Sequence, residues 1–411
     1  MAPNRAKAEE NDGIWPSQGV ALTWTMTLNP RLLLQTAALT HSRAISMNAM
    51  NPSEDSFRNR IQKASNKLKL GFISSDFRSH AMGQVVIGIL ELLDRSHFEV
   101  FGYLSKVRDD PVASRCKASL DVARPIEILT DEEALALIGV DDISILFNLN
   151  GDTDGSRLGI MLKRPSPIQV SLIGDSKTSG TDVAHMYLYS DRAASPPDTL
   201  TAELQAERAV LMPHSYHLSS HLIGGNIRLT MDNKKEKNHP NMALDSFDDV
   251  SLAWRLQEKK IVIGSLNRSK KIDPLILRCW VQTSKRILQN IKMILALFAK
   301  PVQAGDSLMM EASALGLLKT SVRLFEQASP SEYLARISRV DLALDTRVWN
   351  GEMTTLDVLY EATPLITIQG NQMSNRFGIS SAQALGIGDT GTSVATLKEY
   401  EDQAVALASG L

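Results

Sequence analysis

Residues Lys67–Gly83 read KLKLGFISSDFRSHAMG, and the interpretation of the whole chain starts from this segment. Its apolar run Leu68–Ser74 is typical of a buried strand, and the amphipathic run Gln84–Asp94 is typical of a helix. A polar turn between a strand and a helix lies at the carboxyl edge of a sheet, where open α/β sheets bind ligands. His80 in this turn is therefore a candidate functional residue, although an ordinary solvated turn histidine gives the same pattern.

Strand and helix patterns alternate from this segment to about residue 212, which predicts βαβ units and a parallel sheet. The expected strands are Leu68–Ser74, Phe98–Leu104, Ile143–Leu149, Ile168–Ile173, Met186–Tyr189 and Ala209–Met212. The expected helices are Val85–Leu93, Pro111–Leu120, Asp131–Ile138 and Gly155–Leu162.

Residues 218–258 interrupt this pattern, because they contain the charged run DNKKEKNH at Asp232–His239 and few apolar residues. The alternation then starts again. The expected strands are Lys259–Leu266, Lys292–Leu297, Ser321–Phe325, Asp341–Leu344 and Pro364–Ile368. The expected helices are Pro274–Ile287, Ser307–Leu315, Pro330–Ile337, Thr354–Ala362 and Asn375–Leu385.

These patterns predict an α/β protein with two doubly wound parallel-sheet lobes and a ligand cleft between them. The expected divisions are an N-terminal extension (1–66, short helices or disorder), a first lobe (67–217), a linker or insertion (218–258) and a second lobe (259–411). Lys67–Gly83 opens the first lobe, so its turn is expected at a ligand-binding edge.

Composition excludes several function classes. Among 411 residues the formal net charge is -2 and aromatic residues make up 5%, so we expect no nucleic-acid partner. No apolar run has the length of a membrane span, and MAPNRAKAEENDG has no apolar core of a secretion signal. Cys116 and Cys279 have no metal or redox spacing. We therefore expect a cytoplasmic protein without a membrane partner.

Several further segments resemble, in the same order along the chain, the catalytic region of the O-GlcNAc transferase and SPINDLY family. The similar segments are Lys67–His80, ILFNLNGDTDG at Ile145–Gly155, RPSPIQVSLIGDSKTSG at Arg164–Gly180, the Met-Pro-His turn at Met212–His214, NRSKKIDPLILRCW at Asn267–Trp280, LDTRVWNGEMTTLDVLY at Leu344–Tyr360 and Thr363–Gly386. Each motif is modest alone, but their order from Lys67 to the C-terminus is specific.

The resemblance implies a GT-B fold with two Rossmann-like lobes. It also implies transfer of a sugar from a nucleotide diphosphate donor to Ser or Thr hydroxyls of a protein acceptor, with inversion and without a metal ion or another cofactor. UDP-GlcNAc is the expected donor, with GDP-fucose or another sugar nucleotide left open. An epimerase-like enzyme of the same fold has no positive feature in this sequence.

The resemblance also implies the site residues. The catalytic candidates are His80, which assists proton transfer or positions groups, and Lys271, which neutralises the leaving diphosphate. The helix near Thr354 offers backbone N–H groups to phosphate, and Asp357 is expected to hold the ribose. The donor-binding candidates are Asn267, Thr354, Thr355, Asp357, Gly351, Thr178 and Gly180. Lys271 could instead belong to a solvated lysine pair, and capping alone could explain one of the two threonines.

The sequence departs from the family at several of these positions. Glu352 and Met353 stand where the family has His and Thr, and a carboxylate there would repel phosphate. We expect Glu352 to face solvent or a cation such as Arg347, which leaves the N–H groups of Met353 and Thr354 to a ligand. Other departures are Asp175-Ser176-Lys177 after Gly174, Ser331 and Leu334 in place of a Lys and a His, and an end at Leu411 before further family helices. A second hypothesis is therefore a non-catalytic or truncated relative that binds nucleotide or protein.

Two other patterns carry weaker signals. His214, His217 and His221 have spacing that could gather a metal, but no neighbouring cysteine or carboxylate completes a site, so none is predicted. Gly386–Gly391 fits the G-x-G-x-x-G pattern of dinucleotide-binding turns. Because it follows a helix rather than a strand, we interpret it as a helix C-cap and loop.

Overall fold

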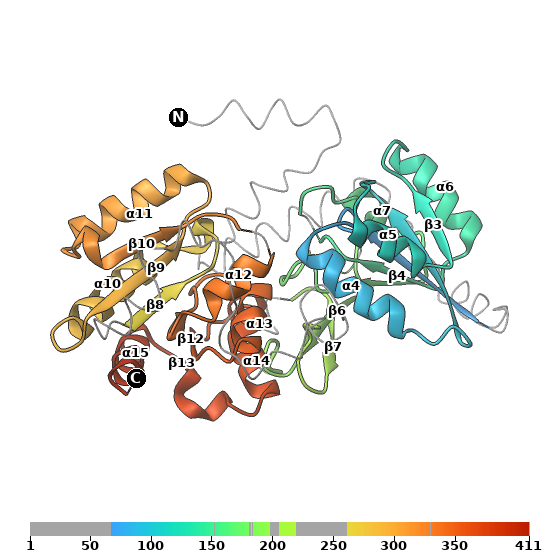
Figure 1. Ribbon diagram of the computed structural model, residues 1–411. Coiled ribbons are helices and arrows are strands. Elements are labelled where there is room, and N and C mark those ends of the chain that lie inside the picture. Colours follow the sequence, from blue (N-terminus) through green and yellow to red (C-terminus); the bar gives the residue numbers. More distant parts are fainter. Residues whose placement is uncertain are drawn as a thin grey trace, which may run out of the picture. The chain divides into compact units, whose positions relative to one another are not determined.

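A computed structural model describes residues 67–151, 153–180, 182, 184–197, 205–218, 261–328 and 330–410. The chain divides into two compact units, Met1–Ser220 and His221–Leu411, which are called unit 1 and unit 2 below (Figure 1). The predicted N-terminal extension and nearly all of the predicted linker lie outside the described residues. Each unit is therefore described by itself.

Unit 1 contains a parallel sheet of seven strands in the order β3-β2-β1-β4-β5-β6-β7. Strand β1 pairs with β2 on one side and β4 on the other, with Leu70 opposite Val100 and Ile145. The chain order reverses between β1 and β4, so ligands are expected beyond their carboxyl ends. The strands are β1 (Leu68–Ser74), β2 (Phe98–Leu104), β3 (Val122–Pro125), β4 (Ile145–Asn148), β5 (Ile168–Ser171), β6 (Tyr187–Asp191) and β7 (Arg208–Met212).

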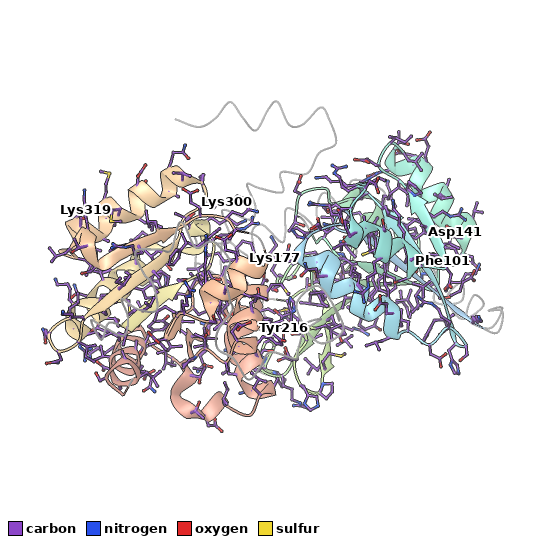
Figure 2. The ribbon with its side chains drawn as sticks, in the orientation of Figure 1. Phe101, Asp141, Lys177, Tyr216, Lys300 and Lys319 are labelled. Atoms are coloured by element: carbon purple, nitrogen blue, oxygen red, sulfur yellow. The ribbon has the colours of Figure 1, made fainter. Side chains whose placement is uncertain are left out.

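The helices of unit 1 are α4 (Ala81–Leu92), α5 (Pro111–Ala118), α6 (Asp131–Asp141) and α7 (Leu158–Leu162). Local sequence explains where two of them begin. Asp110 caps α5 before a proline at the first position, and Thr130 caps α6 in a reciprocal capping box with Glu133. Buried Asp141 at the end of α6 accepts a hydrogen bond from Tyr103 Oη at 2.9 Å and pairs with Arg124 at 2.7 Å (Figure 2).

Unit 2 contains a second parallel sheet, with six strands in the order β10-β9-β8-β11-β12-β13. Its chain order reverses between β8 and β11, which makes their carboxyl ends the corresponding ligand-binding edge. The strands are β8 (Ile261–Ser265), β9 (Met293–Phe298), β10 (Val322–Phe325), β11 (Leu342–Leu344), β12 (Leu365–Ile368) and β13 (Ser393–Val394).

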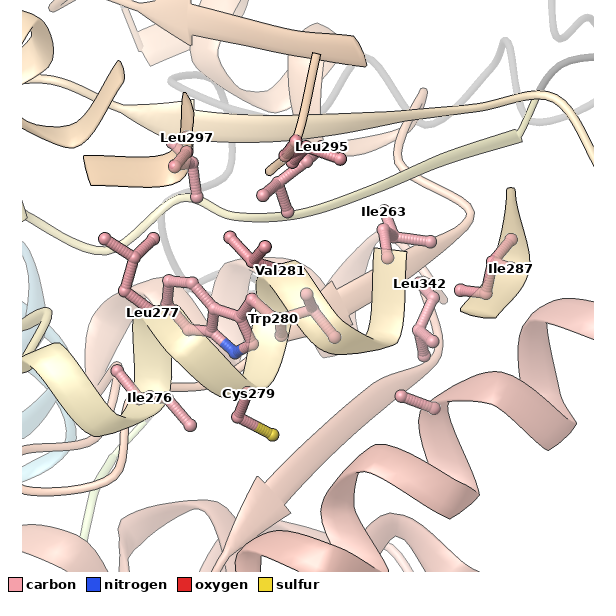
Figure 3. Close-up of a cluster of buried hydrophobic side chains, with 14 of the residues drawn as sticks. Ile263, Ile276, Leu277, Cys279, Trp280, Val281, Ile287, Leu295, Leu297 and Leu342 are labelled. Carbon is pink, nitrogen blue, oxygen red and sulfur yellow. The ribbon is translucent and has the colours of Figure 1, made fainter. Parts of the chain in front are cut away.

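A large hydrophobic core fixes the helices of unit 2 on this sheet. The fully buried Trp280 of α10 (Pro274–Ile287) packs with Leu277, Leu295 and Ile263 (Figure 3). Its Nε1 donates to the hydroxyl of Tyr400 at 3.4 Å. The other helices are α11 (Val302–Ala314), α12 (Pro330–Ile337), α13 (Met353–Tyr360), α14 (Phe377–Ala384) and α15 (Leu397–Ser409).

The prediction of two α/β lobes with separate parallel sheets is confirmed, and each predicted strand has an observed counterpart within a few residues. The prediction missed β3, β13 and α15. Strand β3 has four residues, ends in Pro125 and lies at a sheet edge, where a proline is tolerated. Helix α15 begins with a capping box of Thr396 and Glu399, a signal that was present in the sequence.

The glycine-rich segment Gly386–Gly391 starts with the predicted helix C-cap, but it continues into a short π-helical turn, Gly388–Thr392, rather than a loop. Helix α14 ends at Ala384, and Gly386 has a φ of 72° with its N–H donating to the carbonyl of Gln383 at 2.9 Å. In the described part of the chain, no helix is both long and apolar enough to cross a membrane.

Gly83 allows the turn after β1 to fold against the first turn of α4. A Cβ at this position would lie 2.1 Å from the carbonyl oxygen of Arg78 and 2.6 Å from that of Asp76, and both atoms are backbone. We expect Gly83→Ala to lower the free energy of unfolding by roughly 1–3 kcal/mol, the usual cost of overpacking. Thermal unfolding followed by circular dichroism measures this change.

Gly139→Ala is the matched control for this prediction. Gly139 lies in α6, is exposed, and a Cβ there would meet no atom within 4 Å. Alanine should therefore stabilise the helix by about 0.5–1 kcal/mol. Equal effects of the two substitutions would show that the close approach at Gly83 does not constrain the turn.

Candidate functional site

The carboxyl ends of β1 and β4 in unit 1 are joined by buried polar side chains. The backbone N–H of Ser75 donates to Asn150 Oδ1 at 2.7 Å, and Asn150 Nδ2 donates to Ser75 Oγ at 2.8 Å. Asn150 Nδ2 also lies 3.3 Å from Asp76 Oδ2. Behind them, Asn148 Nδ2 contacts Nε2 of the buried His185 at 3.0 Å, and burial lowers the pKa of His185 to about 4. This network holds the turn of Lys67–Gly83 in place.

His80 lies at the N-cap of α4, with about a third of its side chain exposed. Its Nδ1 accepts the N–H of Met82 at 3.3 Å and lies 3.5 Å from Asp76 Oδ2. These two contacts require different protonation states, since Nδ1 accepts from Met82 only without its proton and donates to Asp76 only with it. His80 therefore caps the start of α4 and lies beside the carboxylate of Asp76.

Thr178 and Gly180 also lie in unit 1, where they belong to a tight loop beside β7. Thr178 Oγ1 donates to the buried carboxylate of Glu207 and accepts the N–H of Gly180 at 3.0 Å. The Ser179 N–H and hydroxyl bind the other oxygen of Glu207 at 2.6 and 2.5 Å. Burial raises the pKa of Glu207, and these donors oppose that shift. The loop is thus anchored by its own side chains.

Unit 2 concentrates polar side chains around the buried Asp345, which follows β11. The carboxylate accepts hydrogen bonds from Asn267 Nδ2 at 3.0 Å, Gly351 N at 2.9 Å and Thr367 Oγ1 at 2.8 Å. It also accepts the N–H of Thr346 at 2.8 Å. Four donors from the β8 turn, the loop after β11 and strand β12 therefore meet on one carboxylate.

Burial nevertheless raises the pKa of Asp345 to about 6, and the hydrogen-bond donors and the positive charge of Lys271 act against this rise. Tyr400 of α15 donates its hydroxyl to the Asp345 carbonyl at 3.0 Å. Helix α15, which sequence patterns did not predict, therefore holds the backbone of this residue.

Lys271 lies in the short helical turn Ser269–Lys271 and is 9% exposed. Its Nζ donates to the carbonyl of Asn350 at 2.5 Å and lies 4.4 Å from the ring centroid of Trp349. Burial lowers the pKa of Lys271, while the carboxylates of Glu352 and Asp345 raise it and the charges of Lys270 and Arg268 lower it. Lys271 is therefore a buried amine rather than one of a solvated pair.

Gly351 and the first turn of α13 complete this edge of unit 2. A Cβ on Gly351 would lie 2.5 Å from Thr355 Oγ1 and 2.9 Å from Asn267 Oδ1, so this position requires glycine. A cavity of about 10 Å³ opens between Asn267, Asp345 and Thr354, among other residues. It holds about one water molecule, far less than a nucleotide. A nucleotide at this edge must therefore move side chains or bind at the surface beside the cavity.

The structure thus brings together five polar positions or turn residues of unit 2: Asn267, Asp345, Gly351, Thr354 and Thr355. Lys271 lies on the segment after β8 that also carries Asn267. Asp357 is buried one turn further along α13. Asp345 and Trp349 were missed as site residues. The signal for Asp345 was its position directly after an expected strand, but only tertiary contacts show how many donors it receives.

The expected surroundings of Glu352 are corrected in part. Arg347 donates to Asp273 at 2.9 Å, whereas the Glu352 carboxylate lies 3.8 Å from Lys271 Nζ. The Thr354 N–H also donates to the Gly351 carbonyl at 3.0 Å, so this N–H already has a partner within the chain. Glu352 itself has φ 46° and ψ −115°, a conformation that favours glycine and costs on the order of 1–3 kcal/mol.

The structure also shows the surroundings of Leu334 and His217, which the sequence analysis singled out. Leu334, which replaces a family histidine, is buried in a core cluster with Ile337 and Phe325. His217 Nδ1 contacts the Leu218 carbonyl at 3.1 Å, while His221 lies outside the described residues. The side chain of Ser331 also lies outside them.

The sequence profile of glycosyl transferase family 41 matches residues 38–250 and 249–411. The chain belongs to this family. The resemblance of its ordered motifs to the O-GlcNAc transferase and SPINDLY family is thereby confirmed. Its two α/β lobes are of the GT-B type.

Curated relatives in family 41 are similar over most of this chain. A probable UDP-N-acetylglucosamine--peptide N-acetylglucosaminyltransferase SEC from Arabidopsis thaliana is 30% identical over 83% of this chain and 33% of its own length. The SPINDLY protein of Oryza sativa subsp. japonica, with the same enzyme description, is 26% identical over 79% of this chain and 33% of its own. The chain thus spans about a third of the length of these relatives.

A solved structure also resembles this member of family 41. An O-GlcNAc transferase mutant from Thermobaculum terrenum superimposes with a TM-score of 0.79 at 25% identity, covering 98% of this chain and 71% of that one. This likeness supports the two-lobed α/β fold independently of the sequence motifs.

The titration of Asp345 predicts how the stability of unit 2 depends on pH. Its pKa is about 6 in the folded state, against 3.8 for an ordinary aspartate, so the folded state binds more protons between these values. Stability therefore falls as pH rises through this window. The free energy of unfolding of wild type should fall by roughly 2–2.5 kcal/mol relative to Asp345→Asn between pH 4 and 7.

Denaturant unfolding at several pH values, followed by the fluorescence of buried Trp280, measures this difference. Asp94→Asn is the control, because hydrogen bonds from Ser96 and His97 lower the pKa of exposed Asp94 to about 2. That carboxylate stabilises the fold above pH 4 and loses its effect as pH falls. A pH-independent difference between wild type and Asp345→Asn would show that Asp345 keeps an ordinary pKa.

Proposed function

We propose that this family 41 chain transfers a sugar from a nucleotide diphosphate donor to Ser or Thr hydroxyls of proteins, with UDP-GlcNAc as the donor. The single observation that carries the proposal is Lys271, a buried cation at the carboxyl edge of β8 and β11 beside the glycine-requiring turn at Gly351. Both curated relatives described above carry a UDP-N-acetylglucosamine--peptide transferase name, which supports this donor.

The residues of unit 2 suit the leaving group of this reaction. When the sugar leaves the diphosphate, negative charge develops on the phosphate oxygens, and a buried ammonium stabilises it more than a solvated one. Lys271 supplies that charge, and the positive end of the α13 dipole adds to it. We assign ribose binding to Asp357 and positioning of the donor to Asn267, Thr354 and Thr355. This scheme requires no metal ion.

The chemical step forms a bond between the acceptor oxygen and the anomeric carbon while the bond to the diphosphate breaks. A single displacement of this kind inverts the configuration and releases the hydroxyl proton. We assign His80 either proton transfer or positioning of the reacting groups. Its partly exposed ring lies 3.5 Å from the Asp76 carboxylate at the end of β1, which supports a role at this edge of the sheet. Thr178 and Gly180 stay donor-binding candidates on an anchored loop.

A second function is a nucleotide- or protein-binding relative without transferase activity. Glu352 favours this alternative, because its carboxylate lies 3.8 Å from Lys271, where a phosphate would need to approach. The two functions differ in whether sugar is transferred, not in whether nucleotide binds.

The role of Lys271 predicts a specific loss of affinity. Lys271→Ala should weaken binding of UDP by about 1.5–3 kcal/mol, since hydrogen bonds to charged groups contribute this much. Lys270→Ala is the matched control, because Lys270 is exposed and shares the Trp349 ring at 4.8 Å. Calorimetric titration with UDP and GDP measures both variants and tests the choice of donor. Equal affinities for wild type and a folded Lys271→Ala would exclude the role.

Sugar transfer is tested with a labelled donor and a mixed protein extract. Wild type should label proteins. Lys271→Ala should lose at least as much labelling activity as it loses affinity for UDP. His80→Ala should reduce transfer without weakening UDP binding, because its proposed role concerns the acceptor hydroxyl.

The double variant Glu352→His and Met353→Thr restores the family sequence and distinguishes the two candidate functions. Labelling by wild type that disappears in Lys271→Ala supports catalysis. Labelling by the double variant alone, with none by wild type, would identify a degenerate relative and overturn the proposed transferase.

A further inference from the structure

Three groups surround the ammonium of Lys271, and they differ in how firmly they hold it. The Asn350 carbonyl accepts a hydrogen bond at 2.5 Å, and the Trp349 ring lies 4.4 Å away. The Glu352 carboxylate lies at 3.8 Å. A charge-assisted hydrogen bond spans about 2.7–2.9 Å, so Glu352 forms an ion pair without a direct hydrogen bond. Of the two polar contacts to this ammonium, the one from Glu352 is therefore the longer.

Glu352 also differs from the other two in its backbone and exposure. Its φ of 46° lies in the region that favours glycine, and its side chain is 22% exposed while that of Lys271 is 9% exposed. The attraction to Lys271 helps to hold this strained residue, and a path to solvent is open to the carboxylate. Strained residues of this kind occur at ligand clamps and switch regions.

Resting on the proposed function, we propose that the Glu352 carboxylate occupies the phosphate position at Lys271 in the ligand-free protein and must leave before a nucleotide diphosphate binds. Glu352 is thus an affinity- and specificity-determining residue of the donor site. The Glu352 carboxylate lies 3.8 Å from Lys271 Nζ, so a phosphate that pairs with this ammonium competes with it for the same position.

The exchange also selects among anions. Asp345 and Glu352 already oppose the positive charge of Lys271, whereas Lys270 and Arg268 add to it. A ligand gains only the difference between its own attraction to Lys271 and that of Glu352. A diphosphate, with several negative charges, displaces the carboxylate more effectively than an anion with one charge.

Calorimetric titration of the full chain with UDP and with inorganic pyrophosphate tests this exchange. Glu352→Gln removes the charge but retains the shape, so it should bind both probes about tenfold more tightly than wild type. Glu361→Gln removes a charge at the far end of the same helix and should leave both affinities unchanged. Glu352→Gly also relieves the positive φ, and it should bind at least as tightly as Glu352→Gln.

The two probes separate this inference from the proposed function. Tighter pyrophosphate binding by Glu352→Gln, with no UDP binding by any variant, supports the exchange and overturns the donor site. UDP binding by wild type that Glu352→Gln and Glu352→Gly leave unchanged or weaken overturns the exchange but not the donor site. Equal gains in affinity in Glu352→Gln and Glu361→Gln would show that any loss of negative charge on this helix has the same effect. That result would overturn the proposed exchange. Failure of every variant to bind either probe overturns it as well.

Discussion

The buried carboxylate of Asp345 is the interaction on which the carboxyl edge of the unit 2 sheet depends. Its hydrogen bonds join Asn267, Gly351 and Thr367, which lie far apart in the sequence, and the Tyr400 hydroxyl holds its carbonyl. A buried carboxylate without such donors would be strongly unfavourable, so these segments must converge when unit 2 folds. The turn that carries Lys271 and the start of α13 are thereby positioned by one residue.

In unit 1 the corresponding contacts are made by an amide and a hydroxyl, with the Asp76 carboxylate 3.3 Å from Asn150 Nδ2. Asn150 exchanges hydrogen bonds with Ser75 between the ends of β1 and β4. In both units these polar contacts lie where the strand order reverses, because the helices on the two sides separate there and leave room for side chains. Unit 2 differs in that the buried ammonium of Lys271 lies near the buried Asp345 carboxylate at this edge.

Charge balance around Lys271 explains why this member of family 41 differs from the pattern that its motifs resemble. Burial disfavours the charged amine, and the two carboxylates and the Trp349 ring compensate for part of that loss. A histidine at position 352 would not compensate in this way. Glu352 therefore offsets part of the positive charge of Lys271 from a backbone conformation that favours glycine.

The sequence by itself determined the strand and helix alternation, the two-lobed class and the segments that carry His80, Asn267, Lys271 and Gly351, because apolar periodicity and turn residues are local signals. It missed β3, which is short and at an edge, and α15. It also misplaced the partner of Arg347, which is Asp273. Only the tertiary structure decided that Asp345 gathers four donors and that Glu352 faces Lys271. The contacts from Asn267 to Asp345 and from Lys271 to Glu352 join residues more than seventy positions apart, and no local pattern records which distant side chains share a buried charge.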